Sequence, residues 1–402
     1  MKLLRSILFW SHLTAGVLAG AVILVMSFTG VALALKPQIQ DWIERDVRYV
    51  EAQATPRLTA HQLLTAVQDA KPEAPPQSLT LARDRALAAT VSLGREGNVY
   101  VNPYTGAILG TGSAAATRFF QSMTSWHRYV GATGEYRATG RSATGISNLA
   151  FLVLAITGLY LWLPKQFTLQ HVKAIVWFRR TSTGRARDFN WHNTIGFWCL
   201  IPIVIMTASG AVISYAWASD LVYRVTGSPV PARGGGPRGP EGNPQRPAVI
   251  PAGLDRIWAR AEQQVPTWSL LSMRLPNRED GPVAFTITDG ANWNAFARSN
   301  LTLHAASAEV IQWQPYEGNA LGQKARGWLR FAHTGELGGL AGQIVAGIGC
   351  LGGVFLVCTG LSLAFRRLWN WALWKRLRSS GGDPLGVPSS APDAVRGTAV
   401  MD

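Results

Sequence analysis

The sequence predicts a mainly α-helical membrane protein, with four transmembrane helices that arise from a tandem duplication and two small α+β domains on the outer side of the membrane. Three observations predict this fold class. Four long apolar stretches divide the chain, the basic residues gather on alternate connections between them, and the two halves repeat one order of patterns. A spanning helix needs about 20 predominantly apolar residues, which is roughly what each stretch supplies.

The first apolar stretch, residues 7–35, contains no charged residue and predicts transmembrane helix 1. It is too long for the apolar part of a cleaved signal peptide, which runs about 7–15 residues. Segments 119–163 and 323–365 are each expected to hold a histidine-bearing stretch followed by a transmembrane helix, and 191–218 is expected to be transmembrane helix 3. The predicted protein crosses the membrane several times, so the lipid membrane is its first partner.

Basic residues predict the orientation, because the cytoplasmic connections of membrane proteins carry an excess of Lys and Arg. The start of the chain, the loop 164–190 and the tail 366–402 are all basic. We therefore expect both termini and this loop in the cytoplasm, and segments 36–118 and 219–322 outside. Much of the net charge of +15 then reflects topology and requires no nucleic-acid partner.

The two outer segments repeat the same pattern: an amphipathic helix, a strand-like run, and a hairpin of alternating apolar residues. The offset between the halves is 180 residues at His12 and His192 (192 − 12) and 202 at Val101 and Leu303 (303 − 101). The additional residues of the second half therefore lie in its outer segment. The Gly/Pro-rich loop 228–250 is part of this insertion.

Four histidines stand at ends of the apolar stretches, and each is followed by a small-residue step that contains glycine. An ionisable side chain beside hydrocarbon is a functional candidate by default, and imidazole is a common axial ligand of haem iron. Spans one and three run outward and spans two and four run inward. The expected pairs are thus His12–His192 near the cytoplasmic face and His127–His333 near the outer face. Two imidazoles on each iron suit electron transfer, and the lack of a C-x-x-C-H motif predicts non-covalent haem b.

The glycines have an expected place beside these pairs. Seventeen residues separate His12 from Thr29, and such a helix rises about 26 Å, close to the hydrocarbon thickness of about 30 Å. Gly30 and Gly210 should then lie level with the outer pair, and Gly158 and Gly360 with the inner pair. A residue without Cβ lets a flat macrocycle approach the backbone, although helix packing alone is an equally good reason for small residues.

Arg128 follows a ligand candidate and could bind a haem propionate or serve as an ordinary interfacial charge. We assign no catalytic side chain. The sequence has no nucleotide-binding G-x-G-x-x-G after a strand and no P-loop. Electrons would therefore come from a separate cytoplasmic flavoprotein reductase or from membrane quinol.

Across nearly its whole length the chain resembles the PepSY-associated transmembrane family. The resemblance is carried by His12 with Thr29-Gly30, by Trp126-His127 leading to Thr157-Gly158, by Trp191-His192, and by His333 leading to Thr359-Gly360. The hairpins look like the β part of PepSY domains. Within that family the layout is closest to inner-membrane di-haem ferric-siderophore reductases. This resemblance implies two haem b groups, a bacterial inner membrane, and reduction of Fe(III) in a periplasmic siderophore with release of Fe(II).

Two other functions remain open from the sequence. The chain could be a membrane-anchored PepSY binding or regulatory module that inhibits or senses peptidases without redox activity, which would leave the four histidines unexplained. It could also transport a metal through transient histidine ligation, although no path rich in Met or Cys supports this.

Overall fold

The computed structural model describes residues 2–163, 168–179, 183–232, 248–292 and 294–379. Parts of three expected segments lie outside these residues: the basic loop 164–190, the Gly/Pro-rich loop 228–250 and the tail 366–402. Of the tail, the structure describes residues 366–379, which continue the last long helix without a break.

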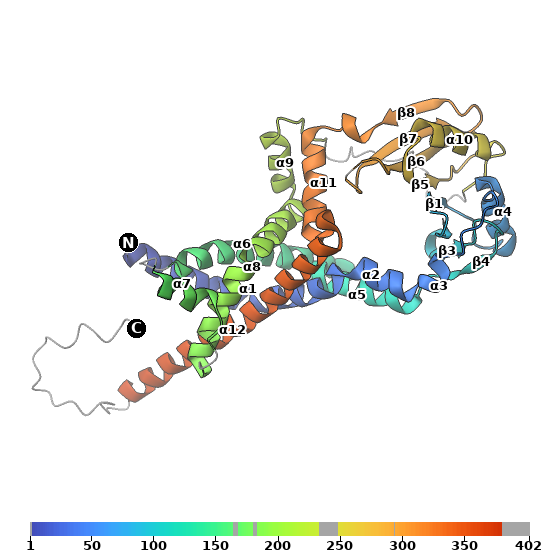
Figure 1. Cartoon of the computed structure of the whole chain (residues 1–402). Helices are drawn as coiled ribbons and strands as arrows, with labels where there is room; N and C mark the ends of the chain where they lie inside the picture. The colour runs from blue at the N-terminus through green and yellow to red at the C-terminus, as the bar shows by residue number, and fades with distance from the viewer. Residues whose placement is uncertain (1, 164–167, 180–182, 233–247, 293, 380–402) are drawn as a thin grey trace, which may run out of the picture.

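Within the described residues, four helices are long and apolar enough to cross a membrane. They are α1 (Lys2–Ala34), α6 (Arg137–Trp162), α8 (Gly184–Ser214) and α12 (Gly339–Ser379). Helix α1 packs against α6 and α12, and α8 packs against the same two, so that the four form a closed bundle. The start of α1 and the end of α12 lie at one end of the bundle, here called the terminal end. The β-strands lie beyond the opposite end, here called the sheet end (Figure 1).

Shorter helices flank the bundle. Helices α2 (Lys36–Ile43) and α3 (Arg45–Arg48) follow α1 towards the sheet, and α9 (Ala216–Val225) follows α8. Helix α7 (Leu169–Val176) lies against α8 at the terminal end. Helices α5 (Ala114–Tyr129) and α11 (Leu321–Thr334) carry the second and fourth histidines and pack against α1 and α8, respectively.

Each histidine-bearing helix turns sharply into the next span. Helix α5 is followed by Val130, which has a left-handed backbone (φ 52°), and α11 is followed by Gly335 (φ 77°). The second corner needs glycine on both sides, because a Cβ atom on Gly342 would lie 2.3 Å from the Gly335 carbonyl oxygen. Valine is rarely left-handed, so the first corner holds strain that glycine avoids in the second.

The strands in the described part of the chain form one antiparallel sheet of eight, in the order β4-β3-β2-β1-β5-β6-β7-β8. The first unit contributes β1 (Ser78–Ala82), β2 (Ala89–Ser92), β3 (Asn98–Val101) and β4 (Ile108–Thr111). The second contributes β5 (Trp268–Arg274), β6 (Pro282–Asp289), β7 (Arg298–His304) and β8 (Val310–Gln314). The two units therefore do not stand as separate domains. They share one sheet and one core, because β1 and β5 pair and close the edge that each unit alone would expose.

The two units repeat each other closely. Both hairpins carry a register shift at the aligned step, Tyr100/Val101 in the first and Thr302/Leu303 in the second. The two steps are 202 residues apart (302 − 100). At the seam between β1 and β5, the fully buried Leu79 pairs with the fully buried Met273, and the Thr80 and Ser272 hydroxyls are hydrogen-bonded at 2.8 Å.

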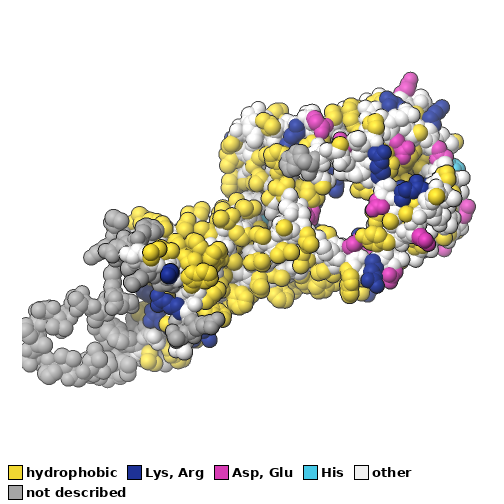
Figure 2. Space-filling view, in the orientation of Figure 1, with side chains coloured by type: hydrophobic (Ala, Val, Ile, Leu, Met, Phe, Trp, Pro, Cys, Tyr) yellow, Lys and Arg dark blue, Asp and Glu magenta, His cyan; other side chains and the backbone are white. Residues whose placement is uncertain are grey.

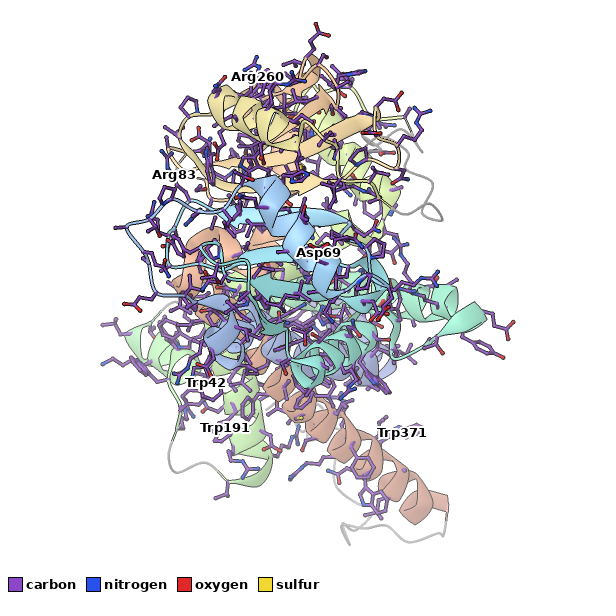
Figure 3. All side chains as sticks on the ribbon, turned by 90° about the vertical axis from the view of Figure 1, so that its right-hand side faces the viewer. Trp42, Asp69, Arg83, Trp191, Arg260 and Trp371 are labelled. Carbon is purple, nitrogen blue, oxygen red and sulfur yellow. The ribbon has the colours of Figure 1, made fainter. Side chains whose placement is uncertain are left out.

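One face of the sheet is covered by α4 (Ala60–Ala70) and α10 (Leu254–Gln264), whose buried leucine, isoleucine and valine side chains form the core. Figure 3 shows these two helices on the side of the sheet away from the membrane bundle. The other face looks back towards the bundle across an opening, visible in Figure 2, whose rim carries both acidic and basic side chains.

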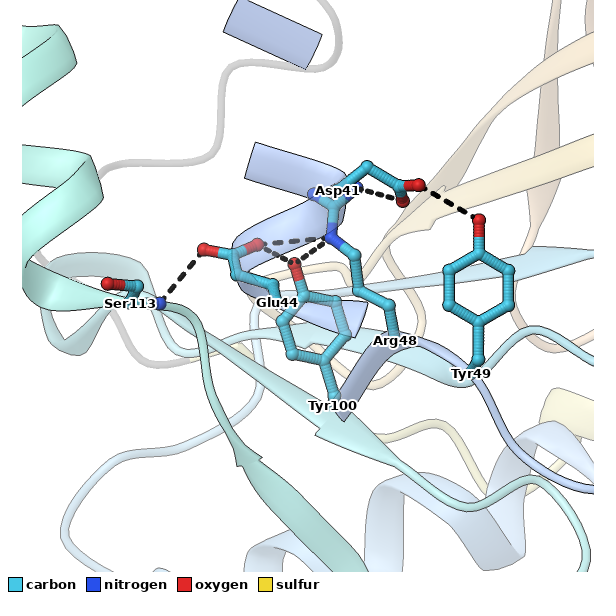
Figure 4. Close-up of polar contacts among 6 residues, drawn as sticks. All are labelled: Asp41, Glu44, Arg48, Tyr49, Tyr100 and Ser113. Carbon is cyan, nitrogen blue, oxygen red and sulfur yellow. Dashed lines mark hydrogen bonds and ion pairs between the residues drawn. The ribbon is translucent and has the colours of Figure 1, made fainter. Parts of the chain in front are cut away.

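A polar network joins the first unit to the bundle (Figure 4). The buried Glu44 carboxylate accepts hydrogen bonds from the Tyr100 hydroxyl (3.0 Å), the Arg48 guanidinium (3.0 Å) and the Ser113 backbone N–H (2.9 Å). Burial raises the pKa of Tyr100 and opposes the lowering effect of Arg48, so the phenol stays protonated and donates. Ser113 is the N-cap of α5, and the network therefore ties strand β3 to the helix that carries His127.

We expect Glu44→Ala to destabilise this joint by about 3 kcal/mol, because it leaves buried donors without an acceptor. The measurement is the thermal unfolding midpoint of the purified protein in detergent. Asp46→Ala is the matched control, since the Asp46 side chain is 89% exposed and is paired with the exposed Arg45. Equal midpoints for the two variants would show that the network contributes nothing.

Candidate functional site

The structure brings the four histidines together as two pairs. His12 on α1 faces His192 on α8, with ring centroids 6.4 Å apart and ring planes at 83°. His127 on α5 faces His333 on α11, with centroids 6.3 Å apart and planes at 64°. The first pair lies towards the terminal end and the second towards the sheet end. We call them the terminal pair and the sheet-side pair.

Each imidazole is held by the hydroxyl of a small-residue step on a neighbouring helix. The Nδ1 atoms of His12 and His192 lie 2.9 Å from Thr157 Oγ1 and 3.0 Å from Thr359 Oγ1. In the sheet-side pair, Nδ1 of His127 lies 3.1 Å from Thr29 Oγ1, and Nδ1 of His333 lies 3.1 Å from Ser209 Oγ. One arrangement is thus built four times.

These contacts fix the tautomer of the rings. The Thr157 hydroxyl already donates to the Val153 carbonyl at 2.7 Å, and the Thr359 hydroxyl donates to the Phe355 carbonyl at 2.7 Å. Such a hydroxyl can only accept from the imidazole, so Nδ1 carries the proton. The sheet-side rings give the same result, because their Nδ1 atoms also lie 2.9 and 2.8 Å from the carbonyl oxygens of Met26 and Met206. Nε2 is left as the basic nitrogen, which is the form that binds a metal.

The glycine of each step lies against the same ring. A Cβ atom on Gly158 would be 3.3 Å from the Cε1 atom of His12, and one on Gly360 would be 3.2 Å from that of His192. For the sheet-side pair, the distances are 3.6 Å from Gly30 to His127 and 3.2 Å from Gly210 to His333. The glycines lie level with the histidines to which the spacing assigned them. The sequence did not predict that each glycine lies directly against an imidazole ring.

The separation of the rings fits two imidazoles that share one metal ion. A metal–imidazole bond is about 2 Å long, and a nitrogen of a five-membered ring lies about 1.1 Å from its centre, given ring bonds of about 1.3–1.4 Å. Two imidazoles on opposite sides of one ion would have centroids about 6.3 Å apart, which matches both pairs.

The surroundings argue against a site made by the protein alone. Within the described residues, no group of three or more His, Cys, Asp or Glu side chains gathers where a metal ion could bind. A bare zinc ion is usually held by at least three protein ligands. Two opposed histidines leave the remaining coordination positions to be filled by a group that brings its own donors, as a planar macrocycle does.

Among the described residues, no hydrogen bond or ion pair joins the Arg128 side chain to either histidine pair. Its guanidinium lies over the ring of Tyr129, 5.3 Å from the centroid, and the side chain is exposed. The neighbouring Trp126 packs over Gly131 at the corner after α5. Trp191 packs on Phe178, with centroids 6.0 Å apart.

Sequence reasoning missed two buried polar residues near the pairs. Asn148 donates from Nδ2 to the Thr207 carbonyl (2.8 Å), and its Oδ1 would lie 2.9 Å from a Cβ atom on Gly210. Asp188 lies one helical turn before His192, and its carboxylate contacts Ser362 and Arg366 of α12. The signal for Asp188 was available, because it is the single acid of a strongly basic loop. Asn148 offers no comparable pattern.

Comparison with known proteins gives one family match. A search of curated proteins gave no match. The model of the PepSY-associated TM region matches residues 9–367, which include most or all of each span, both histidine pairs and the sheet. Because this match covers most of the chain, the protein belongs to the family of the PepSY-associated TM region.

Proposed function

We propose that the protein is a di-haem b electron-transfer protein of a bacterial inner membrane, and that it reduces Fe(III) in a periplasmic siderophore and releases Fe(II). In this proposal both termini are cytoplasmic, the sheet is periplasmic, and the chain arose by tandem duplication. A cytoplasmic flavoprotein reductase or membrane quinol supplies the electrons. The protein is then an oxidoreductase of the ferric-chelate reductase type.

The observation that carries the proposal is the repeated histidine geometry. Both pairs have a centroid separation that one shared metal ion requires, and in all four rings the proton lies on Nδ1. A chance pairing of histidines would not reproduce hydroxyl, glycine and tautomer four times. When bound, haem supplies an iron that gains and loses one electron without a change of ligands.

The chain's own residues do the positioning. The hydroxyls of Thr157, Thr359, Thr29 and Ser209 hold each ring through Nδ1, and the four glycines leave room beside Cε1. Arg128, one residue beyond His127 and exposed, is the proposed partner of a haem propionate. In this proposal a hydrophilic chelate approaches the sheet-side pair through the opening between bundle and sheet (Figure 2). Reduction to Fe(II) weakens the hold of a hard-oxygen chelator, which is how the iron would be released.

The test is a reduced-minus-oxidised visible spectrum of the purified protein, with the ratio of haem to protein. We expect two low-spin b-type haems per chain, and reduction of a ferric siderophore by the pre-reduced protein. Absence of haem after expression with ample haem supply would overturn the proposal.

A second candidate function rests on the free edge of the sheet. Strand β8 lies at one end of the strand order, and its Val310 and Ile311 are 39% and 55% exposed. Such an edge can accept an extended peptide as a ninth strand, which would suit a binding or regulatory module that inhibits or senses peptidases. In that case His127→Ala should leave peptide binding and peptidase control intact, and no redox activity should exist to lose.

The hydroxyl partners predict a difference between the two pairs. In Thr157→Val, His12 loses the acceptor of its Nδ1 proton, and haem affinity at the terminal pair should fall about 10–100-fold, as is usual for partners of metal-bound histidines. Thr29→Val should have a smaller effect, because His127 keeps the Met26 carbonyl at 2.9 Å. Haem retention during dilution in detergent measures both. Equal losses would contradict the assignment of the carbonyl as a second acceptor.

A further inference from the structure

The terminal end of the bundle presents positive charge from several segments. Helix α7 and the residues after it, the start of α8, and the last part of α12 all contribute. The exposed cations are Lys173, Arg179, Arg185, Arg187, Arg366 and Arg367. We call this set the cationic ring. In Figure 2 the described part of this end shows Lys and Arg without acidic side chains, whereas the region of the sheet shows both signs.

Among the described residues, no exposed acidic side chain lies beside the ring. Among the described residues of this end (2–12, 168–179, 183–192 and 362–379), Asp188 is the one acidic residue, and it is 5% exposed. Its carboxylate is engaged by Arg187 (2.9 Å), Arg366 (3.6 Å) and the Ser362 hydroxyl (2.8 Å). Asp188 thus ties the start of α8 to α12 and holds two members of the ring in place, while its own charge stays away from solvent.

Topology alone does not explain this distribution. The rule that sets membrane orientation depends on Lys and Arg, and Asp and Glu contribute little to it. Acidic residues could therefore occur on this face without altering the orientation. The described surface nevertheless exposes no acidic residue at this end. We take this as a sign that the positive charge attracts a negatively charged partner over distances beyond direct contact.

Helices α8 and α12 carry members of the ring close to the terminal histidine pair. Asp188 precedes His192 by four residues on α8, which is one helical turn. Arg366 follows Gly360 by six residues on α12 (366 − 360), or about 9 Å along the helix. Gly360 itself lies against the His192 ring. A protein docked on the ring would therefore sit over the end of the bundle at which electrons must enter.

We infer that the cationic ring is the docking surface for an acidic, soluble one-electron carrier protein of the cytoplasm. The inference rests on the proposed function and chooses between its two electron donors. Each encounter would oxidise the carrier by one electron, with no bond made or broken and no proton transferred. One encounter would thus account for each Fe(III) that is reduced to Fe(II) on the other side. Brief, small, charge-guided contacts are typical of electron-transfer complexes.

The experiment uses the full-length, haem-loaded protein in nanodiscs of zwitterionic lipid. The probe is a reduced flavodoxin, an acidic FMN protein, and stopped-flow absorbance follows haem reduction at rising salt. We expect the second-order rate constant to fall at least about 10-fold between low and high ionic strength, because screening shortens the reach of the ring's charge. The double variant Lys173→Glu/Arg185→Glu leaves the Asp188 contacts untouched and should lower the low-salt rate about 10-fold, with little effect at high salt.

Arg298→Glu is the matched control, since it reverses an exposed charge on β7 of the sheet and should leave the rate unchanged. A second-order rate constant that changes neither with salt concentration nor in the double variant would overturn the inference. So would rapid reduction by a neutral quinol that exceeds reduction by flavodoxin, because the donor would then be the membrane quinol. A normal haem spectrum after dithionite in either case keeps the proposed function intact. A protein that binds no haem would contradict both the proposed function and the inferred docking surface.

Discussion

His333→Ala is expected to lose the haem of the sheet-side pair and to keep the haem of the terminal pair. The substitution removes one of two imidazoles whose ring centroids lie 6.3 Å apart, and no group of three or more His, Cys, Asp or Glu side chains in the described residues could replace it. The terminal pair is separated from it by most of a membrane thickness, about 26 Å along a helix. The ratio of haem to protein should fall from two to one.

Reduction of an external ferric chelate by His333→Ala should fall at least about 100-fold, since loss of a ligand exceeds the usual 10–100-fold effect of losing a ligand's hydrogen-bond partner. His304→Ala is the control: that half-buried ring lies at the end of β7 and belongs to neither pair, and its Nδ1 accepts from the Ala306 N–H at 3.2 Å. Equal loss of both haems in His333→Ala would refute independent sites, and an unchanged ratio would refute the assignment of His333.

Gly360→Leu is expected to have the opposite effect: the haem of the terminal pair is lost and the haem of the sheet-side pair is kept. A Cβ atom at this position would lie 3.2 Å from the Cε1 and 3.7 Å from the Nδ1 of His192, so a leucine must push the ring from its place and away from Thr359. Gly360→Ala should weaken haem binding at this pair without abolishing it. The loss would occur even though alanine favours a helix over glycine by about 1 kcal/mol.

Gly347→Ala provides the matched control on the same helix. Its Cβ would meet only the Ala34 Cβ atom, at an ordinary contact distance of 3.6 Å. The haem-to-protein ratio and the spectrum of the remaining haem distinguish the two variants. If the alanine variants at 347 and 360 retained haem equally, close approach at Gly360 would have no bearing on ligation, and the glycine would serve helix packing alone.

The spans and the pairing of histidines could be predicted because both depend on local regularities. A continuous helix converts spacing along the chain into height, so the 17 residues from His12 to Thr29 were enough to place Gly30 beside the sheet-side pair. The hydroxyls were harder to interpret. Thr29 and Thr157 were visible as members of the small-residue steps, but only the structure shows that each accepts a hydrogen bond from a histidine on another helix.

The joined sheet could not be predicted from the same regularities. Strands β1 and β5 alternate in the way that any half-buried strand does, and nothing in their sequences specifies which edge pairs with which. The polar network around Glu44 could not be predicted either, because Tyr100 is 56 residues away and Ser113 is 69 residues away along the chain. Such contacts depend on tertiary structure that already exists.

The seam between β1 and β5 also constrains the order in which the protein can be assembled. Strand β1 must remain without its partner while the chain from α5 to α9 is synthesised and inserted, since β5 begins only at Trp268. Until then the edge of β1 and the apolar Leu79 beside it lack their cover. Aggregation or capture by chaperones is therefore expected while only the first half of the chain has been made. Biogenesis of the sheet is complete only when the second half has emerged on the same side of the membrane.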